Sequence, residues 1–307
     1  MIRARLAALA AALLPALSGC ATQTPPASID PVVSTTDGAQ AVPAPALWKV
    51  TDEDTTIYLF GTVHVLPKDV DWFSGPVADA LSSSQMLVTE IPTGELATPQ
   101  VQQAFIAKAQ LPAGQTLRAM LDDKQRATYE AALTKYGLPV AAFDRVEPWF
   151  AAMTLSALPL LKNGYSMEAG VEHAIEAKAG SKRREALETV DGQLRLFDEM
   201  PVPVQIAYLV SVSEQLEGVV PTMDRMVAAW VRGDADGLAE LMNKELDDPA
   251  LAERLLYARN RDWAKWVDKQ LDEPGTVFVA VGAGHLAGAN SVQDYLEKAG
   301  TAVVRVQ

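Results

Sequence analysis

Two histidines occur in the same local context near opposite ends of the chain. His64 closes residues 61–64 (Gly-Thr-Val-His), His285 closes residues 282–285 (Gly-Ala-Gly-His), and each motif follows an apolar, β-branched run. Such a run predicts a buried strand, so we expect each motif to be a glycine turn that projects an imidazole from the end of a strand. Because open α/β sheets bind ligands at the carboxyl ends of their strands, we expect His64 and His285 to share one site.

A carboxylate is expected beside these imidazoles. Residues 86–91 (Met-Leu-Val-Thr-Glu-Ile) predict a second buried strand, which a predicted helix over residues 74–84 separates from the first. Strand, turn, helix and strand in this order indicate a parallel crossover. Glu90 then lies at the carboxyl end of the second strand. If the two strands are parallel neighbours, Glu90 and His64 emerge at the same edge of the sheet.

His64, Glu90 and His285 together have the composition of a His₂Glu metal site, which keeps one position open for water. The expected cofactor is a divalent metal ion, with Mn, Co or Zn as candidates. Such an ion lowers the pKa of its bound water toward about 7 and polarises a carbonyl. Glu90 is then either a ligand or the general base. The alternative is that each histidine caps a strand end and hydrogen-bonds a backbone carbonyl.

Other polar residues are candidates for substrate binding. Arg259 and Asn260 lie within a predicted helix over residues 251–271, and a guanidinium presents a planar fork that suits a substrate carboxylate or carbonyl. Glu172 and Glu188 are further acidic candidates. The alternative for all four is an ion-paired or solvated helix face.

Several other chemistries are disfavoured. The glycines of residues 282–288 can cradle a phosphate at a helix start, but about twenty residues follow them, too few for the rest of a nucleotide-binding half. A serine nucleophile elbow and a Walker loop are not visible. Cys20 is the only cysteine, which excludes thiolate catalysis in the folded part. His173 lies in a helical pattern without a glycine turn and is interpreted as a surface or supporting residue.

The elements that must position these residues form an α/β fold. We expect a mixed, largely parallel sheet built from N- and C-terminal segments, with a large helical lobe inserted between them. The C-terminal unit is a strand over 276–281, a turn, a helix over 290–298 and a strand over 302–306. The middle carries a short strand over 184–190 and helices over 101–110, 122–136, 141–161 (broken at its two prolines), 171–179, 193–198, 204–217, 222–233, 235–246 and 251–271.

The N-terminus predicts export and lipid attachment. Residues 1–19 have a positive start and an apolar stretch of roughly a dozen residues, which fits a signal peptide and is too short to span a bilayer. Residues 17–20 (Leu-Ser-Gly-Cys) resemble the bacterial lipoprotein cleavage box, and this resemblance implies acylation of Cys20. The alternative is an ordinary export signal with an incidental cysteine. Ala21, in place of the aspartate associated with inner-membrane retention, favours the outer membrane.

Composition limits the partners. Residues 20–46 are rich in Pro, Ala, Ser and Thr and are expected to form a disordered tether, so that the folded domain covers residues 47–307. The formal net charge of the whole chain is −13, which argues against nucleic acid and against electrostatic docking on anionic lipid. The expected membrane contact is therefore made by acyl chains on Cys20, with the domain facing the periplasm.

The motifs occur in the order found in the TraB/GumN (Tiki-related) family, which the chain resembles from residue 47 to its end. The matching pieces are residues 59–67 (Leu-Phe-Gly-Thr-Val-His-Val-Leu-Pro), 87–90 (Leu-Val-Thr-Glu), 187–189 (Leu-Glu-Thr) with Gln193, Arg259-Asn260 with Trp263, and 281–288 (Val-Gly-Ala-Gly-His-Leu-Ala-Gly).

This resemblance implies a fold related to erythromycin-esterase and haem-uptake (ChaN-like) proteins. For the animal Tiki members it implies metal-dependent peptidase activity that rests on the two Gly-x-x-His motifs and a glutamate. By that matching, His64, Glu90 and His285 take the metal or catalytic roles. The supporting residues are Glu172, Glu188, Arg259 and Asn260.

Two functions are therefore expected from the sequence. The first is a lipid-anchored, periplasm-facing metal-dependent hydrolase, and most readily a peptidase, that acts on a peptide or small-molecule substrate. The second is a lipoprotein of the same fold that captures a peptide or small ligand without turnover.

Overall fold

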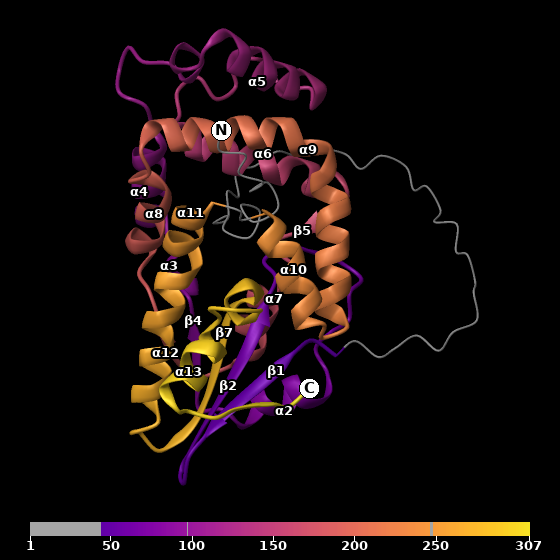
Figure 1. Ribbon diagram of the computed structural model, residues 1–307, viewed down its shortest axis with the longest axis vertical. Helices are drawn as coiled ribbons and strands as arrows, with labels where there is room; N and C mark the ends of the chain where they lie inside the picture. Colours follow the sequence, from indigo (N-terminus) through magenta and orange to yellow (C-terminus); the bar gives the residue numbers. More distant parts are fainter. Residues whose placement is uncertain (1–43, 97, 246–247) are drawn as a thin grey trace, which may run out of the picture.

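A computed structural model describes residues 44–96, 98–245 and 248–307 of the chain. Cys20 and residues 1–43, on which the predictions of a signal peptide and an acylated tether rest, lie outside these residues. A sheet forms the lower part of the molecule and a helical lobe the upper part (Figure 1). The predicted fold class, a largely parallel sheet with an inserted helical lobe, is confirmed.

The main sheet has six strands in the order β6-β4-β7-β2-β1-β8. Its parallel part consists of β6 (Arg183–Ala186), β4 (Met86–Thr89), β7 (Gly275–Gly282) and β2 (Thr55–Thr62). Antiparallel pairs add β1 (Leu47–Thr51) and β8 (Val303–Arg305) at one edge. The strands come from both ends of the sequence, as predicted. A second, two-stranded sheet pairs β3 (Leu66–Pro67) with β5 (Tyr165–Ser166).

Both faces of the sheet are covered, because the strands alternate their side chains between the two faces. On one face, Val277 and Val279 of β7 pack with Trp263 and Val267 of α12 (Ala258–Gln270) and with α13 (Val292–Ala299). On the other face, Phe278 packs with α2 (Gly75–Ser83) and the helical lobe. The result is a layered α/β domain with one hydrophobic cluster on each face of the sheet.

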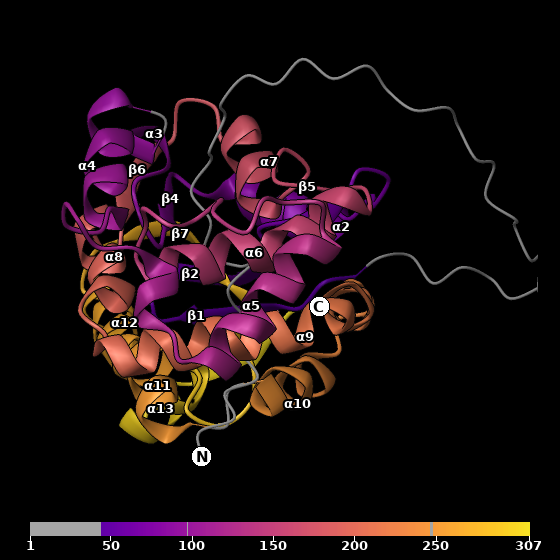
Figure 2. The ribbon, with the colours of Figure 1, turned by 90° about the horizontal axis from the view of Figure 1, so that it is seen from above.

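The helical lobe lies over the sheet, where Figure 2 shows α5, α6 and α9 from above. Helix α9 packs against both α6 and α5. Among the described residues, no helix is both long and apolar enough to cross a membrane. The remaining elements are α3 (Thr93–Leu96), α4 (Pro99–Ala109), η2 (Leu117–Met120), α5 (Asp123–Lys135), α6 (Pro148–Lys162), α7 (Val171–Lys178), α8 (Val190–Asp198), α9 (Val202–Val231), α10 (Ala235–Glu245), α11 (Pro249–Ala252), the π-helical turn η3 (Glu253–Tyr257) and η4 (Ala283–Leu286).

Two prolines lie inside continuous helices. Residues 141–161 were expected to break at Pro148 and Pro159; α6 begins at Pro148 but continues through Pro159. Pro221 lies inside the 30-residue α9, which replaces the two helices expected over 204–217 and 222–233. Each proline removes one backbone hydrogen bond, which favours a bend over a break when the flanking turns are packed. Figure 1 shows α9 crossing the lobe and then turning down toward the sheet.

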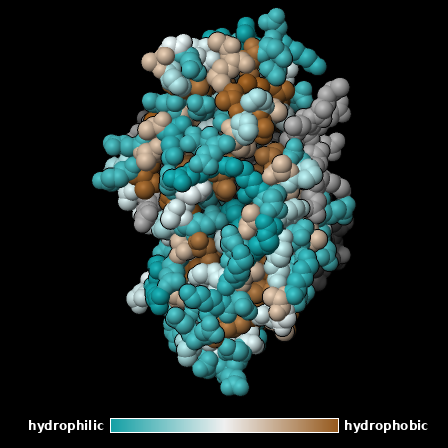
Figure 3. Space-filling view, turned by 60° about the vertical axis from the view of Figure 1, so that its left-hand side comes forward, coloured by the Kyte–Doolittle hydropathy of each residue, from teal (hydrophilic) through white to brown (hydrophobic). Residues whose placement is uncertain are grey.

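The sheet order also differs from the simplest expectation. β2 and β4 are parallel but are not neighbours, because the C-terminal strand β7 lies between them and pairs with both. The first strand, β1, was not predicted, although it forms a hairpin with β2 through residues 52–54. The face brought forward in Figure 3 is mainly hydrophilic and carries small, separate apolar patches. Isolated apolar side chains of this kind are ordinary on a protein surface.

Candidate functional site

The carboxyl ends of the four parallel strands converge at one edge of the sheet. Glu90 directly follows β4, His64 lies two residues after β2, and His285 lies in η4, which begins where β7 ends. Glu188 lies two residues after β6, and its backbone N–H donates to the carbonyl of Glu90 at 2.8 Å. Strand ends at this edge are where α/β sheets build ligand sites. The predicted convergence of residues from both ends of the chain is therefore present.

The motif glycines do not form the turns that the sequence suggested. Gly61 and Gly282 are strand residues, and neither they nor Gly284 has a positive φ. Their role is close approach: a Cβ on Gly61 would lie 3.0 Å from the Cα of Ala283, and one on Gly284 would lie 2.1 Å from Cε of Met242. The absence of a side chain, rather than a left-handed backbone, is what these positions need.

Arg259 is the centre of a buried polar network. Its Nε donates to Oε1 of Glu188 at 2.7 Å, and its Nη2 donates to Oε2 of Glu90 at 2.7 Å and to Oε2 of Glu188 at 3.1 Å. Its Nη1 contacts Nε2 of His285 and donates to the carbonyl of Leu255, both at 3.0 Å. These contacts use all five N–H groups of the guanidinium. Arg259 therefore has no spare donor for a substrate, contrary to the predicted clamp.

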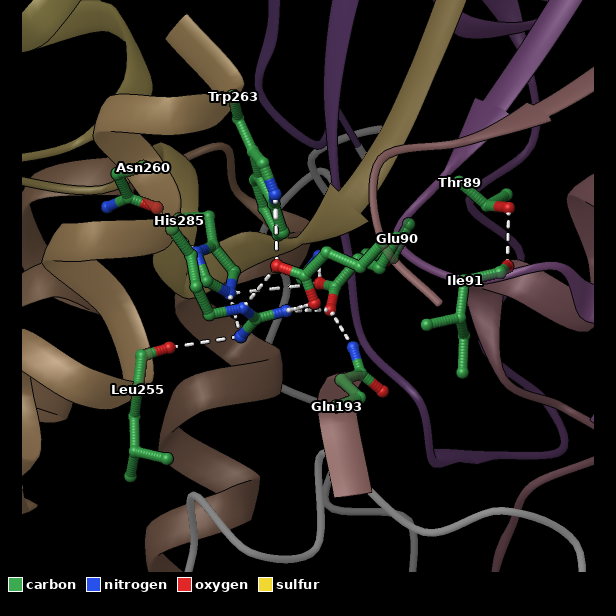
Figure 4. Close-up of polar contacts among 12 residues, drawn as sticks. Thr89, Glu90, Ile91, Gln193, Leu255, Asn260, Trp263 and His285 are labelled. Carbon is green, nitrogen blue, oxygen red and sulfur yellow. Dashed lines mark hydrogen bonds and ion pairs between the residues drawn. The ribbon is translucent and has the colours of Figure 1, made fainter. Parts of the chain in front are cut away.

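A π-helical turn presents this network to the strand ends. The turn η3 ends one residue before Ala258, where α12 begins, so Arg259, Asn260 and Trp263 follow it directly. A π turn inserts an extra residue and rotates the following helix face, and such turns are frequent at functional sites. Asn260, Trp263 and His285 approach from one side of the site, and Glu90 and Gln193 approach from the other (Figure 4).

The tautomer of His285 follows from its two partners. Because a guanidinium can only donate, Nε2 of His285 accepts from Arg259 and the proton is on Nδ1. That N–H donates to Oδ1 of Asn260 at 2.5 Å, while Nδ2 of Asn260 donates to the carbonyl of Asn290 at 2.7 Å. The His285 ring also packs against Trp263, with 4.2 Å between the ring centroids. Burial, and then the charge of Arg259, lower the pKa of His285 to about 3, so the ring is neutral.

Glu90 is held ionised. Burial alone would raise its pKa, but the charge of Arg259 and the N–H of Gly282 are among the interactions that lower the pKa of Glu90 to about 2. Its Oε1 accepts from Gly282 N at 2.7 Å, and its Oε2 accepts from Nε2 of Gln193 at 2.8 Å. Glu188 behaves differently: burial and the neighbouring charge of Glu90 raise its pKa, although Arg259 opposes this.

His64 belongs to a separate pair. Its Nδ1 lies 2.6 Å from Oε1 of Glu172 in α7, and the same carboxylate accepts a hydrogen bond from the hydroxyl of Thr62. Burial lowers the pKa of His64, but the charge and hydrogen bond of Glu172 outweigh burial, so the pKa lies above its usual 6.5. Among the described residues, Nε2 of His64 has no hydrogen-bond partner.

One cavity connects the two groups. Its empty space, counted together with the solvent at its open side, is about 730 Å³, and its polar lining includes His64, Glu90, Arg259 and His285. Three further predicted residues do not line the cavity but bond to residues that do: Asn260 to His285, Glu172 to His64, and Glu188 to Arg259. The structure thus gathers all seven predicted site residues of the folded domain around one cavity, in two hydrogen-bonded groups.

The predicted three-residue metal site is not assembled in this arrangement. In the part of the chain that the structure describes, no three His, Cys, Asp or Glu residues are grouped to hold a metal ion. Nε2 of His285 and Oε1 of Glu90 are 3.8 Å apart, a separation that two ligands of one ion can have. However, the lone pair of Nε2 accepts from Arg259, so an ion there would face a buried guanidinium. The residues as arranged do not fit a metal.

Three contributors were absent from the predicted site. Gln193 and Trp263 bond to Glu90 and Glu188 respectively, at 2.8 and 3.0 Å. Both belong to the motifs that carry the family resemblance, which was the available signal. Thr62 lies within the first Gly-x-x-His motif. His173 is exposed on α7, in keeping with its interpretation as a surface residue.

The layered α/β fold and the paired Gly-x-x-His motifs define a class of protein that the family comparison identifies. The model of the TraB/PrgY/gumN family matches residues 46–305, and the chain belongs to this family. Neither the comparison with curated proteins nor that with solved structures gave a match.

Proposed function

We propose that the protein is a hydrolase that cleaves an amide or ester bond, most readily in a peptide-like substrate, with His64 as the general base. The observation that carries this proposal is the His64–Glu172 pair. Nδ1 is committed to Glu172 at 2.6 Å, which leaves Nε2 as the basic nitrogen at the cavity that His64 lines. A histidine oriented by a carboxylate in this way is the usual arrangement of a catalytic base.

In the proposed reaction, Nε2 of His64 takes a proton from a water molecule as the water oxygen attacks the substrate carbonyl. Glu172 stabilises the imidazolium that forms, and Thr62 holds Glu172 in place. The imidazolium then donates its proton to the leaving amine or alcohol. Glu90, Arg259, Glu188 and His285 keep the strand ends fixed around the substrate, because their mutual bonds leave little freedom.

Metal dependence was expected from the sequence, and it requires a rearrangement. A divalent ion would polarise the carbonyl if Glu90 and His285 held it. Arg259 would then have to release Nε2 of His285 while staying between two buried carboxylates. We therefore assign no step to a metal and expect hydrolysis to persist after chelation. A strict requirement for added Mn, Co or Zn would show that Arg259 moves.

The test is a pH–rate profile on peptide and ester substrates. We expect the rate to rise with pH through the pKa of His64, above 6.5. His64→Gln should lower kcat by about 10²–10⁴-fold. Glu172→Gln removes the charge that raises the pKa of His64, so the rising limb should move to lower pH. His173→Gln, on the exposed face of the same helix, is the matched control. A profile unchanged by both site variants contradicts the proposal.

A second function, ligand capture without turnover, has its own support. The donors of Arg259 are all satisfied within the protein, and most of the cavity lining is apolar. Saturable binding with no product formed at any pH would favour this function over hydrolysis.

We also propose that acyl chains on Cys20 anchor the domain to the bacterial envelope, facing the periplasm, with the outer membrane favoured. The support is the sequence Leu-Ser-Gly-Cys at residues 17–20 and the tether that follows it. Cys20→Ser should release the protein from the membrane fraction. Retention of that variant in the fraction would count against lipid anchoring.

A further inference from the structure

The cavity beside the polar network has an apolar end. Nine of its sixteen lining residues are Val, Met, Leu or Ala. Six of them come from helical segments that follow β6 in the chain, with Met223 and Met226 on α9, Leu238 and Met242 on α10, and Leu255 and Leu256 on η3. Methionine side chains are flexible and polarisable, so they adapt to apolar groups of differing shape.

The polar end offers little to a charged ligand. Of the described residues that line the cavity, Arg259 alone carries a permanent positive charge, and two carboxylates already neutralise it. Glu90 is ionised at the same edge. A ligand carboxylate would lose its hydration, and the other cation that can form at the cavity, protonated His64, is already paired with Glu172, so burying the carboxylate is costly. A neutral carbonyl carries no charge and therefore avoids this desolvation cost.

We propose that this cavity selects an uncharged amide or ester whose adjoining apolar group enters the methionine- and leucine-lined end, and that it rejects the corresponding carboxylate. This inference rests on the proposed function for the position of the carbonyl, which it places beside His64. The apolar group has two possible sources, an apolar peptide side chain or an acyl chain, and both present the same chemistry to the cavity.

One glycine of the cavity lining, Gly284, is in close contact with Met242. Gly284 lies in η4 beside His285, and a Cβ there would meet the Cε and Sδ atoms of Met242 at 2.1 and 2.9 Å. Because the contacted atoms are the far end of a flexible side chain, Gly284→Ala should displace the Met242 thioether and leave the backbone in place. The place that Met242 takes in the cavity lining therefore depends on the absence of a side chain at Gly284.

The test measures equilibrium binding by calorimetry to the N-acetyl, N-butanoyl and N-octanoyl derivatives of glycinamide. Burial of a methylene contributes roughly a fourfold gain in affinity, so octanoyl should exceed butanoyl by on the order of 100-fold. N-octanoylglycine, the carboxylate twin, should bind at least about tenfold more weakly than its amide. N-acetyl-norleucinamide tests the side-chain source: its gain over N-acetyl-glycinamide assigns the apolar end to a peptide residue, and a gain confined to the octanoyl series assigns it to an acyl chain.

Met226→Gln places a polar group of similar size in the apolar end and should reduce octanoyl-glycinamide affinity by about tenfold, with little effect on the acetyl probe. Met120→Gln, on a residue outside the cavity lining, is the matched control. If Met226→Gln fails to fold, the chain-length series on the unaltered protein still tests whether the cavity selects an apolar group. Affinity that does not depend on chain length, or a carboxylate that binds as tightly as its amide, overturns the proposal.

The outcomes separate this inference from the proposed function. If probes are hydrolysed during the measurement, the binding series is repeated on His64→Gln. Chain-length-dependent binding without any hydrolysis supports the selective cavity and counts against the hydrolase. Hydrolysis without chain-length preference supports the hydrolase and overturns the selective cavity.

Discussion

The environment of Arg259 fixes the charge state of the whole site. A guanidinium whose N–H groups are all used turns two buried carboxylates and one imidazole into a single network. Because Arg259 is always protonated, Glu90 stays ionised, and burial together with the charge of Arg259 keeps His285 neutral. The residue that can gain or lose a proton near neutral pH is His64. It lies outside this network, and one of its ring nitrogens has no partner among the described residues.

The neutral state of His285 predicts a loss of stability in acid. Its pKa is about 3 in the folded protein and about 6.5 when unfolded. Between these values the unfolded chain binds one more proton, so stability falls as pH falls, by about 1.4 kcal/mol per pH unit. His285→Gln removes this titration. The free energy of unfolding, measured in urea at pH 7.0 and 5.5, should drop by roughly 1 kcal/mol less in His285→Gln than in the unaltered protein.

His173→Gln provides the control for this comparison, because His173 is exposed. It should show the same pH dependence as the unaltered protein. If His285→Gln also keeps the full pH dependence, then His285 is not the neutral, buried group that its contacts with Arg259 and Asn260 require.

The position of His64 depends on how helix α7 begins. The N–H of Val171, the first residue of α7, donates to the carbonyl of Val63 at 3.0 Å. This bond ties the helix to the segment that carries His64 and brings Glu172 within reach of the imidazole. At Gly170, an added Cβ would lie 2.2 Å from the carbonyl oxygen of His64. The junction therefore has no room for a side chain.

Gly170→Ala should disturb this junction. The contacted atom is backbone and cannot rotate away, so either α7 or the His64 segment must shift, at a cost of about 1–3 kcal/mol in the free energy of unfolding. The shift should also weaken the His64–Glu172 contact and bring the pKa of His64 back toward 6.5, as measured by NMR titration. Gly218→Ala in α9 is the control, since its Cβ would meet nothing within 4 Å. Equal stability of the two variants would contradict this account.

At the scale of elements, the sequence predicted correctly those segments whose structure depends on nearby residues. Apolar runs located β2, β4 and β7, and the helix expected over residues 122–136 is α5, which the structure shows to begin with a capping box at Asp122. The sequence failed where distant packing decides. The persistence of α9 through Pro221 depends on neighbours that a periodicity does not reveal. The pairing of His64 with Glu172 is a similar case. It depends on where α7 packs, and the residues around His64 in the sequence do not indicate this.

The whole molecule depends on strands from both ends of the chain. The described chain begins beside its own C-terminus: the side chain of Gln307 donates to the carbonyl of Pro45, and Val306 N donates to the carbonyl of Leu47. The resemblance and the strand patterns predicted that both ends would contribute to one sheet. They did not predict that β7 would lie between β2 and β4. The sequence pattern of a single strand does not indicate which distant strand it pairs with.

This central position predicts an asymmetry between two C-terminal truncations. A chain of residues 44–274 lacks β7, so β2 and β4 each lose the strand that joins them, along with Val277, Phe278 and Val279 of the core. We expect no cooperative urea transition by circular dichroism, because neither part of the divided sheet keeps a buried partner. A chain of residues 44–301 lacks only the edge strand β8, whose Val304 is 56% exposed. It should unfold cooperatively at a lower urea midpoint. A cooperative transition in the shorter chain would contradict this prediction. It would mean that the inserted helical lobe folds stably on its own, without β7.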